Sequence, residues 1–475
     1  MPLDVAAIRP PALAGSFYPA DAGQLTRMVD DALAGAAPFH GTPKAVISPH
    51  AGFVYSGEIA GSAYAAVRAR RDAIRRVVML GPCHRVPVRS FAVPSHQAFA
   101  TPLGPVPVDR EAIERLLRHD WVELSDEAHL PEHCLETQLP FLQRILDDFS
   151  IVPIIVGGAP PQLTDKLLTE LWGGEETLVV ISSDLSHFND YDTAGRMDLA
   201  ACQAIEALEP RSLGQEQACG RHAIYGLLHR ARALDLRATT LDLRNSGDTA
   251  GRDHRERVVG YAAVAFEDSA EAALSPEHRR KLLEAAARTV ASGIKRGKPP
   301  DVAVESYPWP LRAHRASFVT LKIDDKLRGC VGSVKPHQPI ISDVVSSAYK
   351  AAFSDQRFSP LTAEELGDRA DGEGRMTFSV SILSHPRPIA FGSEAEAEAA
   401  LRPGEDGVIL QDGPKRGLFL PQVWESTGPE PRTFLRHLKG KAGLPEDHWS
   451  ESLKLFRYRT ETFGGRLRLE ASEAA

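Results

Sequence analysis

The sequence predicts an α/β domain followed by an α+β domain. The first part alternates short runs rich in β-branched residues with longer helical patterns, which is typical of a largely parallel sheet. The second part has alternating strand patterns and a hairpin signal, which favour a more antiparallel sheet. The chain is 475 residues long, which exceeds one ordinary domain.

Five apolar runs in the first part are candidate strands. They are continuous rather than alternating, as expected for strands that are covered on both faces. A helical stretch from Glu136 to Leu146 places Leu139 and Leu142 at helical spacing between two of the runs. The runs are residues 45–48, 76–80, 151–156, 177–181 and 258–264.

A polar, alanine-rich stretch at residues 267–274 is the predicted linker. Ser275 and Pro276 then resemble an N-cap followed by proline at the first helical position. Beyond this helix, residues 317–323 and 376–383 are candidate strands, and an Asp-Gly pair at residues 412–413 separates two more. The second part is therefore expected to form a domain of its own.

The bulk composition argues against several classes of protein. A net charge of -8 argues against a nucleic-acid-coating role, because phosphate binding needs clustered positive charge. The 5 cysteines are scattered without a C-x-x-C pair, which favours reduced cytosolic thiols. We find no signal peptide and no apolar run of about 18 residues, so we expect a cytoplasmic protein without a membrane span.

Three of the early strand candidates end in loops that carry a histidine: His50, His84 and His187. The carboxyl ends of parallel strands converge on one crevice, where ligands bind. Three imidazoles, with Asp184 beside them, can hold a divalent metal such as Fe(II), Zn or Cu. A single histidine after a strand is more often a capping or packing residue, but three such histidines favour a shared site.

His133 and Glu136 form a second candidate pair. They are three residues apart, so a helix places them on one face, as an acid/base pair or as support for a metal site. The alternative is a helix N-terminus whose acidic residues are favoured by the helix dipole. Both interpretations stay open from the residues alone.

Asp248 lies in the segment Asn245–Thr249, before the last strand candidate of the first part. It can supply a carboxylate ligand, or the segment can be an Asn/Gly/Asp turn, which the spacing alone favours.

In the second part, Cys330 follows Arg328 and could be a nucleophilic thiol. A buried small cysteine between two glycines is the preferred interpretation. Residues 355–360 resemble an ordered loop with an ion pair.

Five separated motifs together resemble the Memo family. The resemblance covers about residues 8–266, which we take as the first domain, and it implies a fold like that of the class III extradiol ring-cleavage dioxygenases. The motifs are residues 9–18, Ser48–Gly52, Gly81–His84, His133–Glu136 and Ser183–His187.

The Memo resemblance also implies a site. It places a metal at His50 and His84, with His187 lining the same pocket, and we expect His187 to act there as an acid/base group. Animal members of the family use a cysteine as third ligand in a segment that matches Asn245–Thr249. Thr249 stands at about that place in this sequence, so Asp248, next to it, becomes the expected third ligand. His133 and Glu136 complete the expected catalytic set.

Residues 275–467 resemble the AMMECR family, through residues 327–332, 355–358 and 417–421. Both families occur beside a radical-SAM protein in a shared bacterial system, the AmmeMemoRadiSam system. Here the two domain types are fused, which implies that they act on one pathway with the radical-SAM protein as partner.

We expect a metal-dependent, dioxygenase-like oxidoreductase that uses Fe(II), with Cu or Zn as alternatives, on an aromatic or phenolic substrate. The alternative is a non-catalytic module that binds a metal or a peptide. A full ligand set with open positions favours chemistry, and two histidines without a third ligand favour binding. A role in RNA modification lacks support, because no stacking platform or basic stripe is visible.

Overall fold

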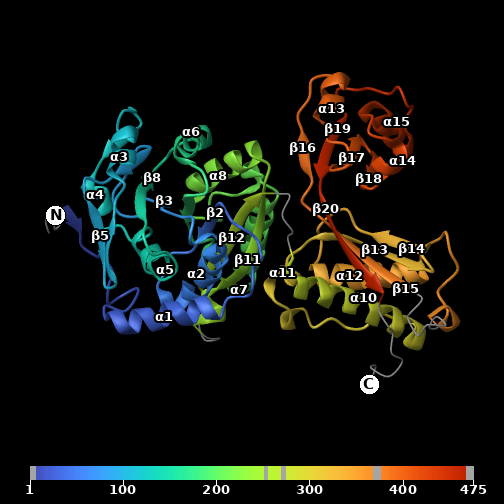
Figure 1. Cartoon of the computed structure of the whole chain (residues 1–475), viewed down its shortest axis with the longest axis horizontal. Coiled ribbons are helices and arrows are strands. Elements are labelled where there is room, and N and C mark those ends of the chain that lie inside the picture. Colours follow the sequence, from blue (N-terminus) through green and yellow to red (C-terminus); the bar gives the residue numbers. More distant parts are fainter. Residues whose placement is uncertain (1–6, 251–254, 269–273, 367–375, 467–475) are drawn as a thin grey trace. The chain divides into compact units, whose positions relative to one another are not determined.

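The computed structural model describes residues 7–250, 255–268, 274–366 and 376–466 (Figure 1). The chain divides into two compact units, Met1–Ser275 and Pro276–Ala475. The first unit is an α/β structure and the second contains two antiparallel sheets.

Four parallel strands form the centre of the first unit. Each coincides with an apolar run that the sequence predicts, and Val46, Val78 and Val180 in these strands are completely buried. Continuous apolar sequence is what full coverage of both sheet faces requires. In sheet order the strands are β2 (Ala45–Ser48), β9 (Thr177–Ser182), β3 (Arg76–Pro82) and β8 (Ser150–Val156).

The flanks of this sheet are not parallel to its centre, so the sheet is mixed rather than uniformly parallel. The fifth predicted run becomes β12, which is antiparallel to β2, and β4 is antiparallel to β8. The full order is β10-β12-β2-β9-β3-β8-β4-β7, with β11 also paired to β12. These added strands are β4 (Phe91–Val93), β7 (Val122–Leu124), β10 (His187–Asn189), β11 (Leu236–Asn245) and β12 (Val258–Asp268).

A separate small sheet lies at the N-terminal side of the first unit. It joins β1 to β5 in parallel and β5 to β6 in antiparallel register. The strands are β1 (Ile8–Arg9), β5 (Ala98–Thr101) and β6 (Gly104–Pro107).

Helices cover the central strands of the first unit. α1, α2 and α5 pack together, α6 packs on α8, and these two groups lie on opposite sides of the central strands (Figure 1). α7 packs on β11 and β12. The helices are α1 (Ala22–Ala34), α2 (Phe53–Val67), α3 (Arg110–Leu116), α4 (Asp126–His129), α5 (Leu139–Ile145), α6 (Pro161–Leu171), α7 (Tyr191–Glu206), α8 (Arg221–Ala233) and α9 (Ser246–Thr249).

The second unit contains two antiparallel sheets of four strands each among the residues described. The first has the order β14-β13-β15-β20 and the second β16-β19-β17-β18. The strands are β13 (Ala316–Ile323), β14 (Lys326–Gly332), β15 (Met376–Leu383), β16 (Arg387–Ile389), β17 (Gly407–Asp412), β18 (Lys415–Phe419), β19 (Lys454–Tyr458) and β20 (Thr460–Arg466). The predicted hairpin is the β17–β18 pair.

The helices of the second unit pack on these sheets. α12 packs on β13, on β14 and on α10. Pro276 begins α10, as the sequence predicts. The helices are α10 (Pro276–Arg296), α11 (Trp309–Arg312), α12 (Ile340–Phe353), α13 (Glu394–Ala400), α14 (Val423–Thr427) and α15 (Pro431–Lys441).

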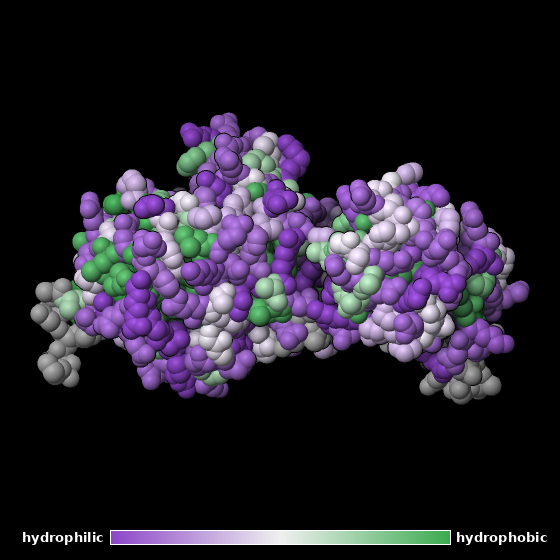
Figure 2. Space-filling view, turned by 90° about the horizontal axis from the view of Figure 1, so that it is seen from above, coloured by the Kyte–Doolittle hydropathy of each residue, from purple (hydrophilic) through white to green (hydrophobic). Residues whose placement is uncertain are grey.

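The surface in Figure 2 is mainly hydrophilic, with apolar side chains in small separate groups. Within the described part of the chain, none of the helices has the length and apolar character needed to cross a membrane.

Candidate metal centre

Two predicted histidines meet at the carboxyl ends of the parallel strands. His50 follows β2 and His84 follows β3, and their ring centroids are 5.1 Å apart. His133, which lies between α4 and α5, completes the group, with ring centroids 5.4 Å from His50 and 4.9 Å from His84. A loop far from β2 and β3 in the sequence therefore supplies the third imidazole.

Gly81 at the end of β3 allows the His133 loop to come this close. A Cβ atom at this position would lie 2.5 Å from Cys134 Sγ, which is shorter than van der Waals contact. The glycine therefore makes room for the side chains of Cys134 and Leu135, which directly follow His133.

The side chain of His50 is held so that its Nε2 atom faces the centre. Ser182 Oγ donates to Cys134 O at 2.6 Å and accepts from Gln138 Nε2 at 3.0 Å. Since its own proton is used, Ser182 Oγ accepts from His50 Nδ1 at 2.8 Å. The proton of the imidazole thus sits on Nδ1, and the lone pair of Nε2 is available to a metal.

Glu132 positions the other two histidines. Its Oε1 atom accepts from His84 Nδ1 at 2.9 Å and from the backbone N–H of His133 at 2.9 Å, and its Oε2 atom accepts from the backbone N–H of His84 at 2.7 Å. Burial raises the pKa of Glu132, but the hydrogen bonds from His133 and His84 hold that pKa well below its usual range. The result is an ionised carboxylate beneath two imidazoles, an arrangement that fixes metal-binding histidines in many proteins.

Two further groups contact His50. Asp184 Oδ1 accepts from the backbone N–H of His50 at 2.8 Å, and Asp184 Oδ2 lies 3.8 Å from His50 Nε2. Cys219 Sγ lies 3.4 Å from the same Nε2 atom. Burial, and then the charge of Asp184, raise the pKa of Cys219 to about 12.

The electrostatics of His50 suit a neutral ligand. Burial lowers the pKa of His50 to about 4, although the charge of Asp184 opposes this shift. The ring is therefore unprotonated near neutral pH and can bind a cation.

The three histidines fit one metal ion. Each offers a nitrogen atom, and these atoms lie within 4.8 Å of one another. Two nitrogen atoms bound to one tetrahedral ion at about 2.0–2.1 Å are roughly 3.4 Å apart, so side-chain rotations have to bring the three nitrogens closer together. The His84 side chain is 28% exposed and the His50 side chain 2%, which leaves one side of the centre open to solvent.

Glu136 lies with the N-terminal segment rather than with His133. Its carboxylate pairs with Arg9 Nη1 at 2.6 Å, and it accepts from Ala12 N, Leu13 N and Tyr18 OH. The segment from Glu136 begins as a short 3-10 helix, so the helical face that the spacing predicts for the two residues does not form. Glu136 therefore anchors the segment that follows β1.

His187 and Asp248, the other expected site residues, are not members of the three-histidine group. His187 is exposed on the edge strand β10, where its Nδ1 atom pairs with Leu185 O at 2.9 Å. Asp248 closes a capping box in α9: it accepts from the backbone N–H of Asn245 at 2.9 Å and from Tyr191 OH at 2.5 Å. The third member of this possible metal-binding group is His133, and Asp248 is not among its members.

Glu132 and Cys219 are site residues that the sequence reasoning missed. Glu132 directly precedes His133, so its adjacency to an expected site residue was a usable signal. Cys219 lies just before α8, far from every other site residue in sequence, and only tertiary structure brings it to His50.

In the second unit, the motif residues around Cys330 support an edge strand. The Cys330 N–H donates to Asp355 Oδ2 at 2.9 Å, and Arg357 Nη2 donates to Cys330 O at 3.2 Å. The predicted ion pair of this loop forms between Asp355 and Arg357 at 2.7 Å. Arg328 pairs with Glu365 through two hydrogen bonds of 2.6 and 3.0 Å.

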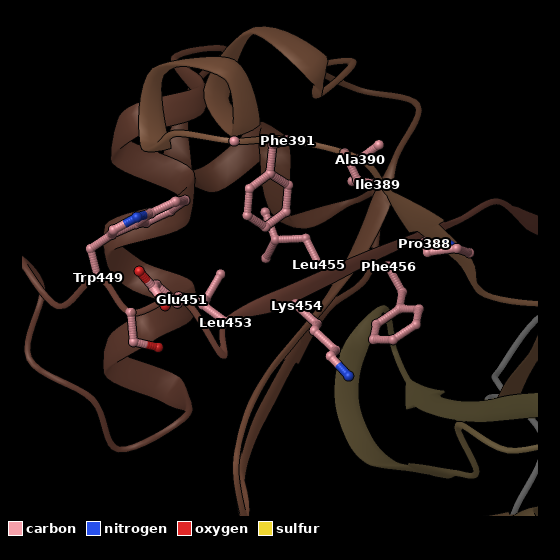
Figure 3. A pocket seen from close by; sticks show the side chains of 12 residues that line it. Pro388, Ile389, Ala390, Phe391, Trp449, Glu451, Leu453, Lys454, Leu455 and Phe456 are labelled. Atoms are coloured by element: carbon pink, nitrogen blue, oxygen red, sulfur yellow. The ribbon is translucent and has the colours of Figure 1, made fainter.

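A pocket of about 640 Å³ lies in the same unit, where the chain leaves β16 and enters β19 (Figure 3). Phe391 and Trp449 line it, with ring centroids 5.5 Å apart. Lys454 points away from Phe391 in this view. The lining is mainly apolar, and Ser450, Glu451 and Lys454 are its polar members.

The first unit is thus an α/β protein with a candidate metal centre. Its three histidines lie at the carboxyl ends of the parallel strands of a mixed sheet. A family model described as Memo-like protein matches residues 9–265, and a second, described as AMMECR1, matches residues 283–463. The chain belongs to the Memo family and carries an AMMECR1 domain in the same polypeptide.

Named relatives and one solved structure are similar to this chain. A MEMO1 family protein of Aquifex aeolicus is 35% identical over 271 residues, which cover 54% of this chain and 99% of the relative. One from Ignicoccus hospitalis is 35% identical over 283 residues, covering 54% of this chain and 98% of the relative. A solved structure titled uncharacterized protein PH0010 from Pyrococcus horikoshii matches with 30% identity and a TM-score of 0.37, over 41% of this chain and 95% of that one.

Proposed function

We propose that the first unit binds one divalent metal ion through His50, His84 and His133 and works as a dioxygenase-like metalloenzyme. One observation carries the proposal: three imidazole nitrogens from separate loops lie within 4.8 Å of one another. Three protein ligands that leave further positions open are typical of catalytic rather than structural metal sites.

The solvent-exposed side of the centre would let a substrate reach a bound metal ion. A bound metal would act as a Lewis acid toward a substrate oxygen and, if it is iron, would also supply redox chemistry. Glu132 holds the His84 ring in place, and Ser182 does the same for His50. In this proposal His187 exchanges protons with the substrate, since its ring is exposed and Nδ1 is already paired with Leu185 O.

A non-catalytic binding module is the second candidate, and the position of Glu136 favours it. The oxygens of this carboxylate accept from Arg9, Tyr18 and two backbone N–H groups, so Glu136 is not free to transfer protons at the centre. The histidine centre of the first unit would then hold a metal or a peptide without turnover.

The presence of both domains in one chain supports a shared pathway. We propose that the Memo and AMMECR1 domains act with a radical-SAM protein as partner, and that the metal is Fe(II), with Cu or Zn as alternatives. Co-purification of the full chain with such a protein from the native cell tests the partner directly.

Metal analysis of purified variants tests the site. We expect about one metal ion per chain in the wild-type protein, and loss of stoichiometric metal in His84→Ala and in His133→Ala. Asp248→Ala should keep its metal, because Asp248 is engaged by Asn245 and Tyr191. Full metal content in His133→Ala, or its loss in Asp248→Ala, would contradict the proposed ligand set.

A further inference from the structure

The thiol of Cys219 lies against the metal-facing nitrogen of His50. Its Sγ atom is 3.4 Å from His50 Nε2, the nitrogen whose lone pair is available. We propose that Cys219 is a fourth ligand of the metal, which gives the centre three nitrogen donors and one sulfur donor and leaves a substrate oxygen to enter as a fifth ligand. This inference rests on the proposed function, because it requires a metal at the three histidines.

One backbone N–H is directed at the sulfur, whereas burial and the charge of Asp184 oppose the thiolate as long as no metal is bound. The backbone N–H of Asp184 donates to Cys219 Sγ at 3.2 Å, and Ser183 Oγ lies 3.8 Å from the same atom. The N–H of Gly220 donates to Ser183 Oγ at 2.9 Å, which fixes that hydroxyl beside the sulfur. Such hydrogen bonds to a ligand atom orient it and tune its metal affinity.

The spacing of the two atoms agrees with joint coordination. Metal–sulfur bonds are about 2.3 Å and metal–nitrogen bonds about 2.0–2.1 Å, so adjacent ligand atoms on one ion are separated by roughly 3.5 Å. The sulfur lies on the His50 side of the centre and outside the three-histidine group itself. A rotation of the Cys219 side chain therefore has to accompany binding.

Asp184 is the competing donor at this position. Its Oδ2 atom is 3.8 Å from His50 Nε2, and its Oδ1 atom is occupied by the His50 backbone N–H. The sulfur lies closer and is not tied to the His50 backbone, so we assign the fourth position to Cys219.

A sulfur ligand shifts the preference of the centre from Fe(II) toward the two alternatives named above, Zn and Cu. Thiolates favour Zn²⁺ and Cu⁺, whereas sites for non-heme Fe²⁺ oxygenases use two histidines and a carboxylate. When the sulfur–metal bond forms, the S–H bond breaks and the proton leaves to solvent, because a coordinated thiol is deprotonated. The centre thus releases one proton more than a three-histidine site would on binding metal.

Cobalt substitution of the full-length protein tests the proposal. Co²⁺ bound to a thiolate shows a sulfur-to-metal charge-transfer absorption in the near ultraviolet, which nitrogen and oxygen ligands do not give. We expect this absorption in the wild-type protein and its loss in Cys219→Ser. Cys83→Ser, a change in the half-buried cysteine next to His84, is the matched control and should keep the absorption. Zn²⁺ affinity in Cys219→Ser should fall by more than about 100-fold.

The outcomes separate the two proposals. Co²⁺ binding to the wild-type protein without the absorption would overturn the role of Cys219 and leave the three-histidine site standing. Persistence of the absorption in Cys219→Ser, or its loss in Cys83→Ser, would also overturn it. Absence of any Co²⁺ or Zn²⁺ binding would overturn both proposals.

Discussion

Glu132 connects the loop that carries His84 to the loop that carries His133 through hydrogen bonds. One carboxylate contacts the ring of His84 and the backbone of both His84 and His133, and only 3% of the residue is exposed. A buried carboxylate with several donors stays ionised, so it adds negative charge next to a cation site. Its value to the centre lies in this combination of orientation and charge.

Replacement of Glu132 by glutamine tests this role. The amide has one acceptor where the carboxylate has two, so at least one hydrogen bond to the histidine loops is lost. We expect Glu132→Gln to weaken metal binding by about 10–100-fold, measured by competition with a chelator. Glu127→Gln, at an exposed glutamate of α4, is the control and should bind as the wild type does. Equal metal affinity in the two variants would show that Glu132 does not support metal binding.

The buried His129 predicts a loss of stability in acid. Burial lowers its pKa to about 4, from an unfolded value near 6.5. The unfolded chain therefore binds a proton between pH 6.5 and pH 4 that the folded chain does not, so the free energy of unfolding falls as the pH falls through this window. The expected loss between pH 7.5 and pH 4.5 is about 2–3 kcal/mol for this group.

Urea unfolding of the metal-free protein at several pH values measures this loss. His129→Gln keeps an N–H donor for Ala92 O, which His129 Nε2 contacts at 3.0 Å, and it removes the titrating ring. The variant should lose less stability than the wild type on acidification, although His50, whose pKa is also lowered to about 4, still contributes. Identical pH dependence in the two proteins would show that His129 titrates normally.

Two of the three histidines of the centre could be predicted from the sequence, because their positions follow from the geometry of parallel strands. His50 and His84 come directly after strands that are parallel neighbours of β9, so their convergence is expected. His133 was an expected site residue, but its role depends on a loop that packs onto Gly81, which no spacing rule encodes. His187 follows the same rule as His50 yet enters β10, which pairs with β12 at the sheet edge.

At the scale of elements, the segment after β1 is anchored to the core by one buried ion pair. Arg9 and Glu136 are both fully buried, and Arg9 also donates to the carbonyl groups of His129 and Glu132. The N-terminal segment therefore lies against the loop that carries His133. Removal of one partner leaves an uncompensated charge in the interior.

We expect Glu136→Gln to lower the free energy of unfolding of the first unit by about 3–5 kcal/mol, measured by denaturant unfolding. Asp30→Asn breaks the surface pair between Asp30 and Arg144 and is the control, with an expected change below about 1 kcal/mol. A change in Glu136→Gln no larger than that of the control would mean that the buried pair does not stabilise this segment.

The strands show which elements the sequence could and could not reveal. β3 and β8 were predictable because their apolar runs are continuous, and every residue after the first of each strand is buried. The direction of β12 could not be predicted, because an apolar run of this kind fits a parallel or an antiparallel neighbour equally well. β4 and β7 have three residues each, too few for a recognisable pattern.

At the scale of the whole molecule, the division into two units predicts independent folding. Hydrophobic clusters within residues 18–266 belong to the first unit, and others within residues 316–458 belong to the second. Residues 1–275 and 276–475 expressed separately should each unfold cooperatively, and the metal should remain with the first fragment. Absence of a cooperative transition in fragment 276–475 would show that it needs the first unit to fold.

Anomalous diffraction from crystals of the metal-loaded protein tests the central claim most directly. Data collected at the absorption edge of the bound metal locate the ion without reference to activity. The account predicts one anomalous peak per chain, surrounded by the imidazoles of His50, His84 and His133. A peak at Asp248 and away from His133, or no ordered peak in protein that retains stoichiometric metal, would contradict it.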